Sequence, residues 1–179
     1  MDGNNRWSKK NNKKSFDGYY EGAKRLISLS SHIFNNYNIQ FISAFALSKK
    51  NLKRSSTVIN TLRRVLNHFL DSKSDLLNRK FQINFKGDFS FLNKSTIKKI
   101  NDLQSQNPRS HQKLIIYINY SGKDDILNAY NRYFLSKSNQ RITDKLIKGH
   151  LYSKNIPDPD ILIRTGGYQR ISDFMLYQI

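Results

Sequence analysis

The chain has 179 residues and a formal net charge of +18, because 31 lysines and arginines stand against only 13 acidic residues. This length fits a single domain, and the absence of cysteine excludes disulfide scaffolds, thiolate metal sites and cysteine nucleophiles. No apolar run approaches the roughly 20 residues that a membrane span needs, and the polar start has no signal-peptide pattern, so we expect a cytoplasmic protein.

The first half of the chain alternates helical and strand patterns. Apolar residues at near-helical spacing predict a helix over 18–35, with Asp17 able to cap its start. The apolar and aromatic run at 39–47 predicts a buried strand. A repeat at i, i+3, i+4 and i+7 predicts the longest helix over 55–79, and alternation over 81–87 predicts a second strand.

The second half continues this alternation. The patterns predict a polar helix over 94–105, a strand over 113–120, helices over 123–137 and 143–151, and a short buried strand at 161–163. Strands that alternate with helices of this length indicate crossover connections between parallel strands. The sequence therefore predicts an α/β fold, with a mainly parallel central sheet flanked by helices in one domain.

In such a sheet, ligands bind beyond the carboxyl ends of the strands. The segment after the last predicted strand contains Arg164, Arg170 and Ser172, together with two glycines that allow close backbone approach. Guanidinium groups suit bidentate phosphate contacts, so this segment fits a diphosphate clamp, and it fits a solvated loop equally well.

Two further segments contain groups that suit a phosphate ligand, and each also has an ordinary structural interpretation. The stretch 48–54 offers a hydroxyl, an amide and four cations, which suit a phosphate group but suit the polar start of a helix better. The N-terminal seven residues place the carboxylate of Asp2 beside amides and Arg6, a set that could hold Mg²⁺ on a phosphate ligand. Read alone, such a terminus is more often a frayed end.

The basic charge permits polyanionic partners such as nucleic acid, an anionic membrane or phosphorylated small molecules. Joint enrichment in lysine and asparagine is also what an A+T-rich coding sequence produces without selection on charge. No zinc-finger, basic-zipper or aromatic RNA-recognition pattern is present in the sequence.

Four segments, in this order, resemble the motifs of the cis-prenyltransferases, or isoprenyl transferases, a family that includes the bacterial undecaprenyl diphosphate synthases. MDGNNRWSKK at 1–10 resembles MDGNGRWAKK, and AFALSKKNLKR at 44–54 resembles YAFSxENWxR. NYSGKDDI at 119–126 resembles NYGGRDEI, and DPDILIRTGGYQRISDFMLYQ at 158–178 resembles PDLLIRTGGExRISNFLLWQ. The resemblance extends over essentially the whole chain.

The resemblance implies an enzyme that condenses isopentenyl diphosphate with an allylic diphosphate, such as farnesyl diphosphate, with Mg²⁺ as the cofactor. Asp2 matches the acid that handles Mg²⁺ and assists departure of the allylic diphosphate, and Asn51 matches an amide that helps to remove the proton. The helix predicted over 55–79 would line the hydrocarbon tunnel. The family also implies a homodimer and, because the product is a lipid, weak membrane association, whereas a nucleic-acid partner is not expected.

The remaining matched positions are substrate-binding positions in the family. They are Gly3, Asn4, Asn5, Arg6, Trp7, Ser48, Arg54, Arg164, Arg170 and Ser172. Among these, Arg164, Arg170 and Ser172 match the clamp for isopentenyl diphosphate, and the N-terminal residues together with Arg54 match the cradle of the allylic diphosphate.

Several positions depart from the family pattern. Asn5 replaces a glycine, and the other departures are Ser15 for a basic residue, Tyr19 for histidine, Lys50 for glutamate, Leu52 for tryptophan and Tyr168 for glutamate. Family chains also normally have an apolar strand before the Met that matches Met1 and continue past Gln178, so we expect 1–179 to be an incomplete domain. These departures leave two alternatives open: a catalytically impaired member (a partner subunit, relic or fragment), or a basic binding protein for nucleic acid or membranes.

Overall fold

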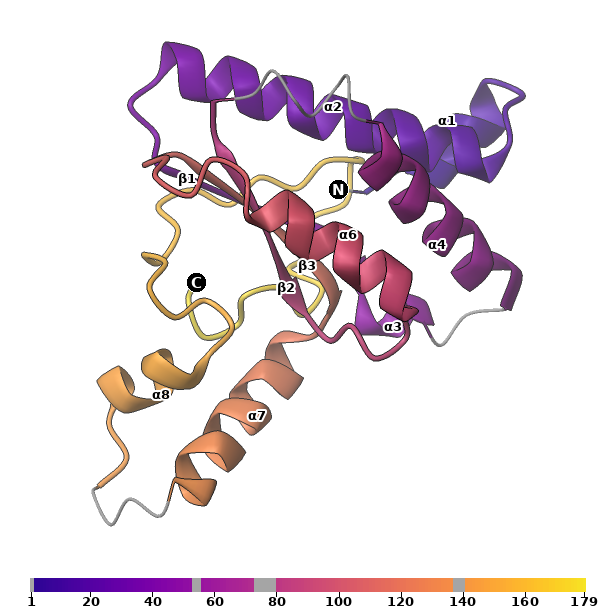
Figure 1. Ribbon diagram of the computed structural model, residues 1–179. Helices are drawn as coiled ribbons and strands as arrows, with labels where there is room; N and C mark the ends of the chain where they lie inside the picture. The colour runs from indigo at the N-terminus through magenta and orange to yellow at the C-terminus, as the bar shows by residue number, and fades with distance from the viewer. Residues whose placement is uncertain (1, 53–55, 73–79, 137–140) are drawn as a thin grey trace.

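Three parallel strands form the central sheet of the protein (Figure 1). The computed structural model describes residues 2–52, 56–72, 80–136 and 141–179. Strand β3 (Lys113–Tyr120) lies between β1 (Phe41–Ser48) and β2 (Gln82–Gly87), and both neighbours pair with it in parallel. Because β3 has a neighbour on each side and both of its faces are covered, seven of its eight residues are buried. This explains its continuous apolar sequence.

The carboxyl ends of the strands meet at one edge of the sheet. Ser48 at the end of β1 lies opposite Tyr120, and Gly87 at the end of β2 lies opposite Ile118. The register of β1 shifts between Phe45 and Leu47. The helix α3 (Lys49–Leu52) follows β1 directly, so its residues lie at this edge.

Helices α2 (Ser15–Asn36), α4 (Ser56–Asp71) and α6 (Lys94–Gln104) cover one face of the sheet (Figure 1). Helix α2 contributes Ile27 and Phe34 to the core, α4 contributes Phe69, and α6 contributes Ile100 and Leu103. They pack against the strand residues Ala44, Leu47, Ile83, Phe85, Leu114, Ile116 and Ile118. This cluster is the main hydrophobic core.

The opposite face of the sheet is covered by the C-terminal segment, which has no helix. Phe174 and Met175 pack against Ile115, Tyr117 and Tyr120. The ring of Phe174 stacks on Phe45 with centroids 4.7 Å apart. Helices α7 (Gly122–Leu135) and α8 (Asp144–His150) pack against each other at the bottom of Figure 1.

Helix α1 (Asn4–Lys10) lies on α2 at two glycines. A Cβ added to Gly18 would lie 2.0 Å from Ser8 Oγ and 2.6 Å from the Asn4 carbonyl oxygen. A Cβ added to Gly22 would lie 2.7 Å from Asn4 Nδ2. The absence of side chains at these two positions therefore sets how closely α1 approaches α2.

The structure confirms the α/β fold with a parallel sheet and most of the predicted elements, but it changes two of them. Lys14, and not Asp17, is the N-cap of α2; Asp17 lies three residues into the helix, where its Oδ2 accepts the Lys14 backbone N–H at 3.1 Å. In the predicted helix over 55–79, α4 spans Ser56–Asp71, and 55 and 73–79 lie outside the described residues.

The prediction of a buried strand at 161–163 is wrong. Ile161, Leu162 and Ile163 are 76%, 48% and 80% exposed and belong to no sheet. In the described ranges, no backbone hydrogen bond joins them to β1, β2 or β3. A strand requires a partner as well as an apolar pattern. No helix of the described ranges is both long and apolar enough to cross a bilayer.

Candidate active site

The N-terminal motif and the arginine-rich segment 164–172 lie together, although they are about 160 residues apart in the sequence. Arg164 Nη2 donates a hydrogen bond to Asp2 Oδ2 at 2.7 Å. The Asp2 backbone N–H donates to Thr165 Oγ1 at 3.0 Å. A terminus that the sequence alone predicts as frayed is therefore fixed by an ion pair and by a backbone hydrogen bond to the same loop.

Arg6 makes a second connection between these segments. Its Nη2 donates to the Gly166 carbonyl oxygen at 2.7 Å and lies 3.8 Å from Asp2 Oδ1. Gly166 has φ +89°, and a Cβ there would lie 3.0 Å from the Asp2 carbonyl carbon and 3.1 Å from Arg6 Nη2. Glycine is thus required at this position by both conformation and space.

Arg164 also organises its own loop. Its Nη1 donates to Ser172 Oγ at 2.7 Å and to the carbonyl oxygen of Arg170. Its Nε is buried and has no hydrogen-bond partner in the described part of the chain. Ser172 has a left-handed backbone, with φ 55°, which is uncommon for a residue other than glycine. The loop therefore holds Nη1 of Arg164, while Asp2 pairs with Nη2.

The cluster is predominantly cationic. Hydrogen bonding from Arg164 is the main cause that lowers the pKa of Asp2, assisted by the Gly3 backbone N–H and the charge of Arg6, while burial acts in the opposite direction. Asp2 is therefore ionised at neutral pH. Within the described ranges it is the only carboxylate paired with the arginines of this cluster, so Arg6, Arg164 and Arg170 together leave an excess of positive charge for an anion.

Two of the positions that depart from the family pattern contact each other. Ser15 Oγ donates to Asn5 Oδ1 at 2.7 Å, which holds the Asn5 side chain against the start of α2. Trp7 is 42% exposed, and Lys13 Nζ lies 5.1 Å from the centroid of its ring. The structure therefore places the side chains of Asn5 and Trp7 against these neighbours, and no described hydrogen bond joins either to the arginine cluster.

The second motif lies at the carboxyl edge of the sheet. Ser48 ends β1 and is partly buried, Asn51 lies on α3, and Lys50 is exposed on the same helix. Leu52 packs against the main core. No described hydrogen bond or ion pair joins Ser48 or Asn51 to the arginine cluster, and Arg54 lies outside the described residues.

The two adjacent aspartates of the third motif have separate partners. Lys49 Nζ makes an ion pair with Asp124, and this hydrogen bond is the main cause that raises the pKa of Lys49. Asp125 is 1% exposed and accepts hydrogen bonds from the Tyr120 hydroxyl at 3.2 Å and the Tyr152 backbone N–H at 2.9 Å. The motif alone gave no signal for the Lys49–Asp124 pair or for the connection to Tyr152.

An apolar cavity of about 110 Å³ extends from the N-terminal motif into the space between α2, α4 and the sheet. Asn4 and Tyr19 line one part of it, and Val65 and Phe69 line another. The other lining residues are Gly22, Ala23, Leu26, Ala46, Leu47, Leu62, Leu66, Phe85, Phe91, Ile116 and Ile118. Asn4 is two residues from Asp2 in the sequence, so the same N-terminal motif contributes to the cavity and to the cationic cluster.

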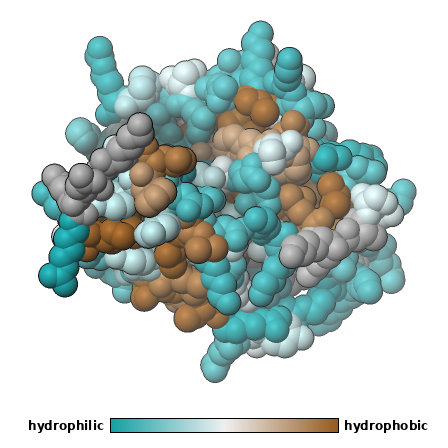
Figure 2. Space-filling view, turned by 90° about the horizontal axis from the view of Figure 1, so that it is seen from below, coloured by the Kyte–Doolittle hydropathy of each residue, from teal (hydrophilic) through white to brown (hydrophobic). Residues whose placement is uncertain are grey.

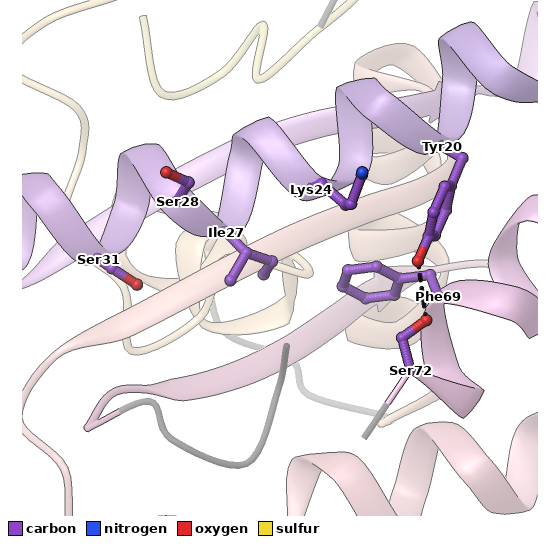
Figure 3. Close-up of a pocket in the computed structure, with 7 residues that line it drawn as sticks. All are labelled: Tyr20, Lys24, Ile27, Ser28, Ser31, Phe69 and Ser72. Carbon is purple, nitrogen blue, oxygen red and sulfur yellow. Dashed lines mark hydrogen bonds between the residues drawn. The ribbon is translucent and has the colours of Figure 1, made fainter. Parts of the chain in front are cut away.

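A second cavity, of about 320 Å³, lies between α2 and the end of α4 (Figure 3). Phe69 lines both cavities. The walls of the second cavity are more polar than those of the first, because Lys24, Ser28 and Ser31 line it and the Tyr20 hydroxyl shares a 3.0 Å hydrogen bond with Ser72 Oγ. Phe69 is thus the boundary between an apolar space and a more polar one.

Asp2 is the residue of this site that could bind a divalent cation. In the described residues, no group of three or more histidines, aspartates or glutamates is placed to hold a metal ion. Mg²⁺ usually takes one or two protein carboxylates and completes its shell with water and substrate phosphate oxygens. A single ionised carboxylate beside three arginines therefore fits Mg²⁺ bound together with a diphosphate.

The chain is similar to known proteins of one family. The model of the undecaprenyl diphosphate synthase family matches residues 1–179. An isoprenyl transferase from Chlamydia caviae is 33% identical over 190 residues, covering 100% of this chain and 76% of the relative. Another from Staphylococcus saprophyticus is 30% identical over 186 residues, covering 100% of this chain and 73% of the relative.

A solved structure shows the same fold. Lavandulyl diphosphate synthase from Lavandula x intermedia, in complex with dimethylallyl diphosphate, superposes with a TM-score of 0.85 at 27% identity, covering 99% of this chain and 80% of that one. The family match, the similar sequences and the shared fold lead to one conclusion. The chain belongs to the undecaprenyl diphosphate synthase family of isoprenyl transferases and is a prenyl-transferring enzyme.

Proposed function

We propose that the chain elongates prenyl chains by condensing isopentenyl diphosphate with an allylic diphosphate such as farnesyl diphosphate, with each new double bond in the cis configuration. The observation that best supports this is that one N-terminal motif contributes both to a cationic cluster and to the lining of an apolar cavity. Asn4 lines the cavity, and Asp2, two residues before it in the sequence, pairs with both Arg6 and Arg164. An allylic diphosphate has the same two parts, a charged head and an apolar chain.

The reaction breaks the bond between the allylic carbon and its diphosphate oxygen, forms a carbon–carbon bond to isopentenyl diphosphate, and releases a proton. In this proposal, Gly3, Asn4 and Arg6 bind the allylic diphosphate, and Arg164, Arg170 and Ser172 bind isopentenyl diphosphate. Asn51 accepts the proton or directs it to a base. Guanidinium groups stabilise the charge that develops on the leaving diphosphate.

Asp2 would hold Mg²⁺, which supplies electrostatic stabilisation of the diphosphate when it is bound. The apolar cavity would hold the growing chain, since most of its lining residues are apolar. The burial of Val65 and Phe69 in α4 supports a tunnel wall that is also part of the core.

We also propose a homodimer. Helix α7 exposes Leu127, Tyr130, Phe134 and Leu135, which are 60%, 46%, 70% and 76% exposed. The rings of Tyr130 and Phe134 stack with centroids 6.4 Å apart. Apolar side chains are also visible on the face seen from below in Figure 2. An exposed apolar helix face of this kind supports association with a second copy, which sedimentation of the wild-type chain and of Phe134→Glu would test.

Weak membrane association in the cytoplasm is a further part of the proposal. Lys9, Lys10, Lys13 and Lys14 are exposed beside Trp7, and none has a carboxylate partner in the described ranges. Cations attract anionic lipids, and an exposed indole suits the interface of a bilayer. Co-sedimentation with anionic vesicles, compared with neutral vesicles, would test this.

The decisive experiment is turnover with farnesyl diphosphate, radiolabelled isopentenyl diphosphate and Mg²⁺, with Asp2→Ala as the control. Labelled polyprenyl product that depends on Asp2 supports the proposal. If the folded wild-type chain gives no product, either alone or extended by its flanking reading frame, the proposal is wrong. The chain is then a catalytically impaired member of the family. Steeply salt-dependent binding to random duplex DNA at physiological salt would instead support the basic binding protein.

A further inference from the structure

The aromatic ring of Tyr168 contacts two arginines from opposite ends of the chain. Arg6 Cζ lies 4.4 Å from the ring centroid, and Arg170 Cζ lies 4.7 Å from it. Both distances are within the range of a cation–π interaction. Tyr168 is 48% exposed and follows Gly166 and Gly167, so its ring lies at the surface of the cationic cluster.

The two arginines differ in their other contacts. Arg6 also donates to the Gly166 carbonyl oxygen and lies 3.8 Å from Asp2. For the Arg170 guanidinium, the ring of Tyr168 is the one contact that the described part of the chain provides, because only its backbone carbonyl bonds to Arg164. The position of the Arg170 side chain therefore depends on Tyr168.

An aromatic ring holds a cation differently from a carboxylate. A carboxylate would pair with a guanidinium and cancel its charge, whereas the ring attracts the cation through its quadrupole and leaves the net charge unchanged. At an exposed site one such contact is worth roughly two- to fivefold in an equilibrium constant. Phosphate oxygens accept hydrogen bonds from the N–H groups in the plane of a guanidinium, so a diphosphate can bind these groups while the ring of Tyr168 keeps its contacts with Arg6 and Arg170.

We propose that Tyr168 is a positioning residue that holds Arg6 and Arg170 beside each other, ready for a diphosphate ligand. This inference rests on the proposed function, since it assigns these arginines to diphosphate binding. Tyr168 is one of the positions that depart from the family pattern. In this chain its ring keeps two cations in place at the junction of the N-terminal motif and the loop 164–172, and it does so without adding negative charge to an anion site.

Binding of inorganic diphosphate to the full 179-residue chain, followed by titration calorimetry, tests the inference separately from turnover. Two lost contacts predict that Tyr168→Ala weakens binding about five- to thirtyfold, whereas Tyr168→Phe keeps the ring and binds within twofold of the wild type. Tyr37→Ala is the matched control: Tyr37 is 59% exposed, and its ring contact in the described residues is to His32. It should bind like the wild type.

The kinetic signature separates positioning from a general loss of structure. Tyr168→Ala should raise KM for both diphosphate substrates more than it lowers kcat, should be rescued by Tyr168→Phe, and should leave the melting temperature unchanged. Wild-type affinity in a folded Tyr168→Ala variant, or a Phe variant as weak as the Ala variant, would overturn this inference alone. If the wild-type chain itself binds no diphosphate, both this inference and the proposed function are wrong.

Discussion

Phe69 separates the apolar cavity from the second cavity, so replacing it should change both stability and product length. Truncating a buried phenylalanine to alanine costs about 3–5 kcal/mol. Phe69 is 7% exposed, but one side of its ring already borders a cavity of about 320 Å³, where packing contacts are absent. We therefore expect Phe69→Ala to cost about 3 kcal/mol, the lower end of that range, as measured by urea denaturation.

The same substitution should connect the two cavities, and products should become longer by one or more isoprenoid units. Val65→Ala is the matched control, because Val65 is 8% exposed and lines only the apolar cavity. Adding Ser31→Leu to the Phe69 variant narrows the second cavity and should shorten the products toward the wild-type length. If folded, active Phe69→Ala gives the wild-type product distribution in thin-layer chromatography, Phe69 is not the boundary that limits the chain.

Asp2→Asn should lower turnover by a hundredfold or more. Pairing with Arg164 lowers the pKa of Asp2, so ionised Asp2 stabilises the folded protein at pH values above the pKa of Asp2 in the unfolded chain. This stabilisation is lost as pH falls through the folded pKa. The melting temperature of Asp2→Asn, measured over the same acidic range, should not show this loss. Burial raises the pKa of Asp125, so its contribution to stability is fully present below the unfolded pKa and is lost as pH rises through the folded pKa. Asp125→Asn should therefore gain in melting temperature relative to the wild type as pH rises. A double-mutant cycle on Asn5 and Ser15, both changed to alanine, should give a coupling of about 0.5–1.5 kcal/mol, and additive effects would exclude a productive hydrogen bond.

The helices and strands that were predicted well from the sequence are those whose hydropathy pattern lies within a single segment of the chain. Strand β3 coincides with the predicted range 113–120, and the observed α6 agrees with the helix predicted over 94–105 to one residue. The apolar triplet at 161–163 contains the same kind of signal but makes no sheet, because strand formation depends on a neighbour that a local pattern does not specify.

The candidate site shows the same distinction. Asp2, Arg6 and Arg164 were predicted from motif order, and the structure brings them into contact. Asn5 and Ser15 were treated as two separate departures, yet their side chains bond to each other. A comparison with the family motifs made one position at a time does not detect contacts between two substituted residues. Such contacts depend on which segments the fold brings together.

The two glycines of α2 affect which substitutions the protein tolerates, as well as how its helices pack. Gly18 lines neither cavity, whereas Gly22 lines the apolar one. A Cβ at Gly18 would lie 2.0 Å from Ser8 Oγ and 2.6 Å from the Asn4 carbonyl oxygen of α1, the helix that follows Asp2. A single-nucleotide change that replaces Gly18 would therefore push α1, and Asp2 before it, away from α2 without altering a residue that lines the site. Mutational tolerance at 18 and 22 should therefore resemble that of catalytic positions, and a survey of random variants would place them with the active site.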